Sequence, residues 1–216
     1  MSARVTVLPR VTVLLVDDHA VVREGYRRLL EDSGRISVVG EATSAAEAVE
    51  QFCRLLPDVV VMDIALPGVS GIEGTRRIRA RAPQARVLVF SMHEDAIFVR
   101  RALEAGAAGY VTKSSAPRVL VRAVDAVASG QRYLSHDVAQ TLAFGDRSAC
   151  QSLSAREFEV LELLVQGCTL GDIAAQLGLT AKTVANHQSS IKQKLGVETG
   201  AQLVRRAMQL GLVASG

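Results

Sequence analysis

Five short apolar runs recur in the first half of the chain, and each is followed by a stretch with helical spacing of its apolar residues. The runs are Val11–Val16, Ile36–Val39, Val59–Met62, Val87–Phe90 and Ala108–Val111, with starts 25, 23, 28 and 21 residues apart. Runs that are apolar on both faces and alternate with helices are typical of a parallel sheet covered on both sides. The pattern predicts an α/β fold of five strand–helix units over residues 11–129, ending at Ser129-Gly130.

The character of the chain changes after residue 150, where helical patterns follow one another without strands. A short helix from Thr169 to about Gly178 is joined by Gly178-Leu179 to a longer helix that starts at Thr180. This arrangement is typical of a helix-turn-helix. With the helix that a Ser154/Glu157 capping box starts, and one over Thr199–Leu210, it predicts an all-α domain of four helices.

The predicted domain boundaries follow from these patterns. We expect the α/β domain over residues 11–129, a linker over 130–150 with a weak helix near 135–144, and the helical domain over 151–214. A length of 216 residues with 49% hydrophobic residues suits two small cores, and 22% charged residues is not the composition of a disordered chain.

Composition also narrows the setting and the partners. Three widely spaced cysteines without a CxxC pair favour reduced thiols in the cytoplasm. No stretch approaches the roughly 18 apolar residues of a membrane span, so we expect no membrane partner, and the N-terminus lacks the pattern of a secretory signal. The net charge of +3 divides into +2 for residues 1–145 and +1 for the rest, so any DNA contact depends on a few placed basic residues.

Polar groups follow four of the five predicted strands, and the carboxyl ends of parallel strands are where ligands bind. The first strand ends in Asp17-Asp18, the third in Asp63, the fourth in Ser91, and the fifth runs into Thr112-Lys113. A single such residue is often only a cap of the next helix, but together they favour a site. Asp63, on the central strand, is the candidate nucleophile, with Lys113 supplying charge and Ser91 a hydroxyl.

Three converging carboxylates repel one another, and a bound cation relieves that repulsion. All-oxygen ligands without clustered His or Cys favour Mg²⁺ over Zn²⁺. Such a cation would also neutralise a phosphoryl group at a carboxylate. The chain has no GxxxxGK[ST] loop and no GxSxG, and Asp63 lacks the second acid two residues on that aspartyl phosphatases commonly carry.

The motifs that carry these residues resemble a known family. VLLVDDH, VVVMDIALPGVSG, VLVFSMH and GAAGYVTKS are similar to the receiver domain of two-component response regulators, which has a flavodoxin-like (βα)5 fold. LSAREFEVLELLVQG and LTAKTVANHQSSIKQKLGV are similar to a LuxR-type DNA-binding domain, with the helix-turn-helix over about Leu170 to Ser189. Together they resemble the NarL/FixJ family over nearly the whole chain.

The resemblance implies roles for individual residues. Asp63 aligns with the phosphoacceptor, Asp18 with the direct Mg²⁺ ligand and Asp17 with the acid that binds mostly through water. The backbone carbonyl of Ala65 would complete the metal ligands. Lys113 matches the lysine that pairs with the phosphoryl group, and Ser91 and Tyr110 match the switch residues. The implied partners are a sensor histidine kinase, double-stranded DNA half-sites and, after phosphorylation, a second copy of the chain.

The helix from Thr180 has one buried stripe, formed by Val184, Ile191 and Leu195, and an opposite face suited to the major groove. On charge alone that face reads as an ordinary solvated surface, but the tight turn and the family pattern favour DNA. The candidate DNA contacts are Lys182, Thr183, Ala185, Asn186, Ser189, Lys192, Gln193 and Lys194. The fourth helix is the candidate dimer surface, by resemblance.

Three hypotheses of function follow. The first is a transcription factor, not an enzyme, that is switched by phosphorylation of Asp63. The second is an orphan regulator that binds DNA without phosphorylation. The third is a small phosphotransfer or phosphatase enzyme with an accessory helical domain, and it requires sustained turnover of phosphoesters.

Overall fold

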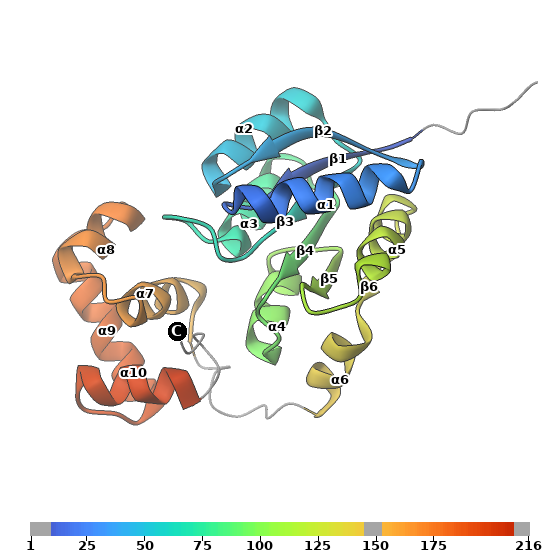
Figure 1. Cartoon of the computed structure of the whole chain (residues 1–216). Coiled ribbons are helices and arrows are strands. Elements are labelled where there is room, and N and C mark those ends of the chain that lie inside the picture. The colour runs from blue at the N-terminus through green and yellow to red at the C-terminus, as the bar shows by residue number, and fades with distance from the viewer. Residues whose placement is uncertain (1–9, 145–152, 210–216) are drawn as a thin grey trace, which may run out of the picture. The chain divides into compact units, whose positions relative to one another are not determined.

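The computed structural model describes residues 10–144 and 153–209 (Figure 1). Its strands are β1 (Val11–Val16), β2 (Ile36–Ala42), β3 (Val59–Met62), β4 (Val87–Ser91), β5 (Gly109–Thr112) and β6 (Tyr133–Leu134). Its helices are α1 (Ala20–Asp32), α2 (Ala45–Leu55), α3 (Gly71–Arg81), α4 (Ala96–Glu104), α5 (Pro117–Ala128), α6 (His136–Phe144), α7 (Ala155–Val165), α8 (Leu170–Leu177), α9 (Ala181–Leu195) and α10 (Gly200–Gln209). The chain divides into two compact units, residues 10–92 with 102–137, and residues 93–101 with 138–144 and 153–209.

One parallel sheet runs through the first unit in the order β2-β1-β3-β4-β5-β6. The predicted parallel α/β architecture is therefore confirmed, with one difference in the number of strands. The sequence predicts five strands, whereas β6 adds a sixth by pairing Tyr133 with Gly109 and Leu134 with Tyr110. A strand of two residues has no readable period, so only its pairing with β5 reveals it.

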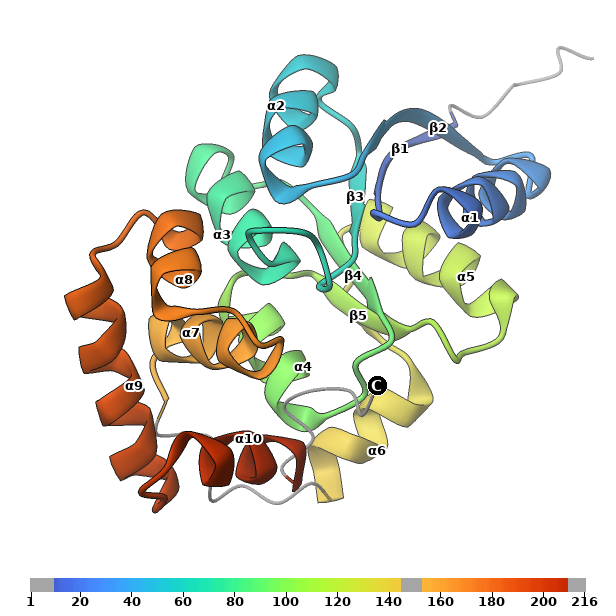
Figure 2. The ribbon, with the colours of Figure 1, turned by 60° about the vertical axis from the view of Figure 1, so that its left-hand side comes forward.

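The two faces of the sheet carry separate cores, because successive side chains of a strand point to opposite faces. Val13 and Leu15 of β1 pack with Leu30 of α1 and with apolar residues of α5. Leu14 and Val16 pack in the other cluster, which includes Phe52 of α2 and Ile78 of α3. Figure 2 shows the strands between α1 and α5 on one side and α2 and α3 on the other. Helices on both faces explain why these strands are apolar on both sides.

Side-chain caps start the helices of the second unit where the sequence predicts them. Ser154 with Glu157 forms a capping box at α7, and Thr169 with Asp172 forms another at α8. The Thr180 side chain accepts a hydrogen bond from the Thr183 amide at the start of α9. The helices α7, α8, α9 and α10 confirm the predicted four-helix domain, and α6 confirms the weak helix near residues 135–144.

The predicted boundaries at residues 11–129, 130–150 and 151–214 stay a prediction, and residues 145–150 and 210–214 of it lie outside the described ranges. Within residues 10–144 and 153–209, no helix combines the length and the apolar character that crossing a membrane requires.

Candidate functional site

Three charged side chains meet at the carboxyl ends of β1, β3 and β5. Lys113 donates hydrogen bonds from Nζ to Asp17 Oδ2 and to Asp63 Oδ2, each at 2.6 Å. The side chains of Lys113, Asp17 and Asp63 are 8%, 3% and 5% exposed. All strands of a parallel sheet have their carboxyl ends at one edge, so residues 96 and 50 positions apart in the chain form one ionic cluster.

The electrostatics of the cluster keep Lys113 charged. Burial lowers the pKa of Lys113, but attraction to Asp63 and hydrogen bonds to Asp17 and Asp63 outweigh it, so the pKa lies above its ordinary value. The ammonium group is therefore a fixed positive charge at neutral pH, beside the Asp63 carboxylate.

Asp18 and His19 lie on the solvent side of the cluster. His19 Nδ1 is 2.8 Å from Asp18 Oδ1, and the His19 amide donates to Asp17 Oδ1 at 2.8 Å. The potential ligand atoms of Asp17, Asp18 and His19 lie within 4.8 Å of one another. The structure thus places the predicted acid pair side by side, with His19 as an additional neighbour.

The residues present fit a divalent cation. Three carboxylates and one ammonium group leave two formal negative charges in excess at this end of the sheet, where Asp17 and Asp63 are buried and Asp18 is exposed. Carboxylate oxygens are the ligands that Mg²⁺ prefers, and two such charges match one Mg²⁺. Asp17, Asp18 and Asp63 are the side chains that would hold it. Ala65 is exposed, and its amide donates to Asp63 Oδ1 at 3.3 Å, whereas its carbonyl as a ligand stays a prediction.

The predicted switch residues are both buried in strands next to this cluster. Ser91 ends β4 and Tyr110 lies in β5, and each is 0% exposed. The Ser91 carbonyl accepts a hydrogen bond from the Lys113 amide at 2.8 Å. This bond ties the end of β4 directly to the residue that carries the ammonium group.

The second candidate surface is one face of α9. Val184, Ile191 and Leu195 are buried, as the sequence predicts, while Lys182, Asn186 and several neighbours are exposed. The turn before α9 contains Gly178 at φ 64°, a left-handed conformation that favours glycine. A short helix, this tight turn and an amphipathic second helix present one polar face to solvent.

Three of the predicted DNA contacts are already bonded within the helical unit. Lys194 Nζ donates to Glu157 Oε2 at 2.6 Å, and Ser189 Oγ donates to the Ala185 carbonyl at 3.0 Å. The Thr183 hydroxyl lies 2.8 Å from that of Thr180. Lys182, Asn186 and Gln193 are exposed and Lys192 is partly buried. The exposed side chains are the best placed of the predicted set for an intermolecular contact.

Both parts of the chain match known families. Residues 13–125 match the model of the response regulator receiver domain, and residues 151–207 match that of bacterial regulatory proteins of the luxR family. The transcriptional activator protein ExaE of Pseudomonas putida is 42% identical over 208 residues, which cover 93% of this chain and 97% of ExaE. The response regulator UvrY of Escherichia coli K12 is 38% identical over 209 residues, which cover 94% of this chain and 95% of UvrY.

A solved structure extends the similarity to three dimensions. RcsB from Salmonella enterica serovar Typhimurium, bound to a promoter in the presence of the phosphomimetic BeF3⁻, is 27% identical with a TM-score of 0.77. The alignment covers 93% of this chain and 99% of RcsB. The chain belongs to the NarL/FixJ family of response regulators. The family is one of transcription regulators rather than enzymes, and its LuxR-type domain binds DNA.

Two supporting groups of this response regulator are missed by sequence reasoning. Arg23 donates from Nη1 to the Asp17 carbonyl at 2.8 Å and from Nε to Glu41 Oε2 at 2.6 Å, so it holds the turn after β1. Asp137 accepts a hydrogen bond from the Thr112 hydroxyl at 2.5 Å. The Arg23–Glu41 and Thr112–Asp137 contacts join residues 18 and 25 positions apart in the chain, which no local sequence pattern reveals.

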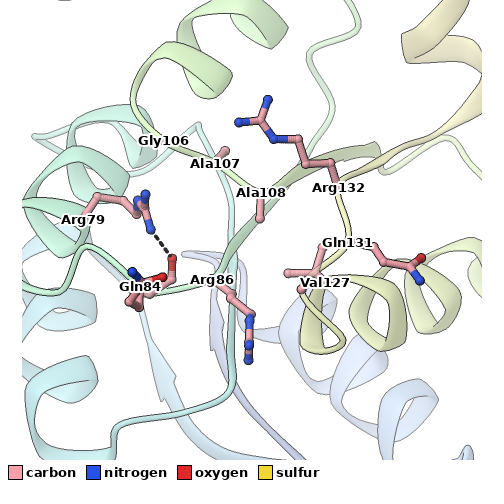
Figure 3. A pocket seen from close by; sticks show the side chains of 11 residues that line it. Arg79, Gln84, Arg86, Gly106, Ala107, Ala108, Val127, Gln131 and Arg132 are labelled. Carbon is pink, nitrogen blue, oxygen red and sulfur yellow. Dashed lines mark hydrogen bonds between the residues drawn. The ribbon is translucent and has the colours of Figure 1, made fainter.

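A cavity of about 400 Å³ lies at the other end of the response regulator's sheet, near the amino ends of β4 and β5 (Figure 3). Three arginines, Arg79, Arg86 and Arg132, line it, and Arg79 Nη1 donates to the Ala85 carbonyl at 3.0 Å. In Figure 3 the side chains of Arg86 and Arg132 point in opposite directions. The cavity is therefore separate from the acidic cluster, and its arginine side chains do not converge on a common centre.

Proposed function

We propose that this response regulator is switched by transfer of a phosphoryl group to Asp63. A sensor histidine kinase is the donor: the P–N bond of its phosphohistidine breaks, and a P–O bond forms to an Asp63 carboxylate oxygen. The observation that carries the proposal is the buried Lys113 ammonium, 2.6 Å from both Asp17 and Asp63. It stands where the negative charge of a phosphoaspartate would arrive.

The residues around Asp63 divide the work of accepting that charge. Lys113 pairs with the phosphoryl oxygens, and Ser91 donates a hydrogen bond to one of them, with Tyr110 following its movement. Asp17, Asp18 and Asp63 would hold Mg²⁺, with the Ala65 carbonyl as a further ligand, and the bound cation would neutralise the charge of the phosphoryl oxygens. The modification adds about −1.5 to −2 charges.

The added charge favours one of two states of the receiver. In the favoured state the protein dimerises through α10, or the DNA-binding face of the helical domain becomes free. In this cytoplasmic dimer, α9 enters the major groove of each half-site. Lys182 and Lys192 contact phosphates, with Lys194 and the Thr183 hydroxyl nearby. Asn186 reads a base, flanked by Ala185, Ser189 and Gln193. The printed descriptions of ExaE as a transcriptional activator and of RcsB as promoter-bound support this output.

The test follows the mass and the solution size of the protein after incubation with acetyl phosphate and Mg²⁺. We expect one phosphoryl adduct and a monomer-to-dimer shift in the wild type, and neither in Asp63→Asn. Asp58→Asn is the matched control, since Asp58 precedes the same strand at its opposite end and bonds only to Thr12 among the contacts described. Equal DNA binding by wild type and Asp63→Asn under phosphorylating conditions would instead establish the orphan regulator.

A further inference from the structure

The carboxylate of Asp137 accepts hydrogen bonds from both ends of the turn that carries Lys113. This turn, Thr112–Ser115, is called the lysine turn below. Asp137 Oδ2 accepts from the Thr112 hydroxyl at 2.5 Å, and Asp137 Oδ1 accepts from the Ser115 hydroxyl at 3.3 Å. Thr112 is 0% exposed, and the Ser115 amide donates to the Thr112 carbonyl at 3.1 Å. Asp137 thus bonds to the residues at both ends of the turn that carries Lys113.

The direction of the hydrogen bonds makes the Asp137 carboxylate hard to replace. The Thr112 hydroxyl has one proton, and the hydroxyls of Ser114 and Ser115 lie 2.9 and 3.0 Å from it. An ionised carboxylate can only accept, so it accepts the hydrogen bond from the Thr112 hydroxyl and leaves a Thr112 lone pair free to accept from Ser114. Without that carboxylate the buried Thr112 hydroxyl has to donate to Ser114 or Ser115 instead, which changes the hydrogen bonds within the lysine turn.

Asp137 is itself held in place by the sheet. Two residues earlier, the Ser135 amide donates to the Tyr110 carbonyl at 3.0 Å, which continues the pairing of β6 with β5. Asp137 then occupies the first turn of α6. The segment that leaves the first unit is therefore bonded to a switch residue's backbone and to the lysine turn within three residues.

We propose that Asp137 is a positioning residue for Lys113, through which the segment from β6 to α6 sets how fast Asp63 accepts a phosphoryl group. This inference rests on the proposed phosphorylation of Asp63. The competing explanation is that Asp137 only stabilises the start of α6, where an acidic side chain favours the helix dipole. That role predicts a loss of stability without a change in phosphorylation.

The chain offers a matched control at the opposite end of the same sheet. Asp58 Oδ2 accepts from the Thr12 hydroxyl at 2.7 Å and from the Thr12 amide at 2.8 Å, so it repeats the threonine–aspartate clamp far from Lys113. Asp137→Ala and Asp58→Ala each remove one such clamp. Thr112→Val removes the hydroxyl that donates to Asp137, and Thr112→Ser retains it.

The experiment measures the initial rate of the phosphoryl adduct with acetyl phosphate by intact mass, over a series of Mg²⁺ concentrations, in the full-length protein. We expect Asp137→Ala and Thr112→Val to lower the maximal rate by about fivefold to tenfold, which corresponds to the net contribution of one ordinary hydrogen bond. The half-saturating Mg²⁺ concentration stays unchanged, because no metal ligand is touched. The double variant that combines Asp137→Ala with Thr112→Val is no slower than either single variant, and Thr112→Ser keeps the wild-type rate.

Two results would overturn the inference, and they are distinguishable. If the wild type forms an adduct and Asp137→Ala forms it as fast as Asp58→Ala, Asp137 serves only α6. If the wild type forms no adduct with this donor or with a histidine kinase, the proposed function fails and the inference fails with it. Should Asp137→Ala not fold, the contrast of Thr112→Val with Thr112→Ser gives the same decision.

Discussion

At the scale of single residues, the acidic cluster depends on Gly71, which packs against the backbone of Asp63. A Cβ on Gly71 would lie 1.8 Å from the Asp63 carbonyl oxygen and 2.8 Å from its carbonyl carbon. The Gly71 amide also donates to the Ile64 carbonyl at 2.9 Å. The start of α3 therefore packs directly on the backbone of the proposed phosphoacceptor, and only glycine permits that distance.

We expect Gly71→Ala to lower the free energy of unfolding by about 3 kcal/mol, the upper end of the range for overpacking, and to slow adduct formation on Asp63. Gly25→Ala is the control, because Gly25 lies within α1 with no atom within 4 Å of its added Cβ. It should raise the free energy of unfolding by about 0.5–1 kcal/mol through helix propensity. Denaturant titration and the adduct rate check both variants, and equal stability of the two would contradict the packing argument.

The same residues mark what a sequence can and cannot predict at this scale. The meeting of Asp17, Asp63 and Lys113 could be predicted from the sequence, because each follows an apolar run and the carboxyl ends of parallel strands lie at one edge of the sheet. Gly71 is visible in the sequence, but the carbonyl oxygen that it faces is not. Asp137 and Arg23 act through contacts 25 and 18 residues away in sequence, which no local pattern encodes.

At the scale of elements, the helix starts were predictable because their signals are local. Ser154, Thr169 and Thr180 each bond an amide three residues ahead, and that bond depends on residues that stand together in the sequence. β6 was not predictable, since two residues become a strand only by pairing with β5. The second role of Glu157 was not predictable either, because its carboxylate caps α7 and also accepts hydrogen bonds from two residues of α9.

Glu157 couples α7 to α9 in a way that depends on pH. Its carboxylate accepts from Ser190 Oγ and Lys194 Nζ, each at 2.6 Å, and from the Ser154 amide at 2.6 Å. Burial raises the pKa of Glu157, but the hydrogen bonds from Lys194, Ser190 and Ser154 outweigh it and lower the pKa from 4.5 to about 2. The stabilisation is complete above pH 4.5 and is lost as the pH falls towards 2.

We therefore expect acid to loosen the contact of α7 with α9 by at most about 3 kcal/mol between pH 5 and pH 2. Hydrogen exchange of the amides in these two helices measures the loss. Glu157→Gln should show faster exchange at neutral pH and a weaker dependence on pH. Glu198→Gln changes an exposed carboxylate of the same unit and should leave both unchanged. A pH dependence that is the same in Glu157→Gln and the wild type would exclude Glu157 as its source.

At the scale of the whole molecule, the order of the two domains was predictable, because each carries several motifs in a fixed sequence. The proposed assembly on DNA requires a second chain and depends on few charges. Lys182 and Lys192 make no ion pair among residues 10–144 and 153–209, while Lys194 is paired with Glu157. About two phosphate contacts per protomer follow from the α9 lysines, which is little for a protein acting as a monomer.

The proposed dimer predicts how salt weakens DNA binding. Each neutralised phosphate contributes about −0.9 to the slope of log K against log salt concentration, so one protomer gives a slope of about −2 and a dimer about −4. We expect the phosphorylated protein to show the steeper slope on selected DNA with two half-sites and the shallower slope on one half-site. Lys182→Ala should reduce the dimer slope by about two, because it removes one contact from each protomer. Asp63→Asn should keep the shallow slope on both DNAs. Equal slopes for the phosphorylated protein on the two DNAs would mean that each chain binds alone, whatever its size in solution.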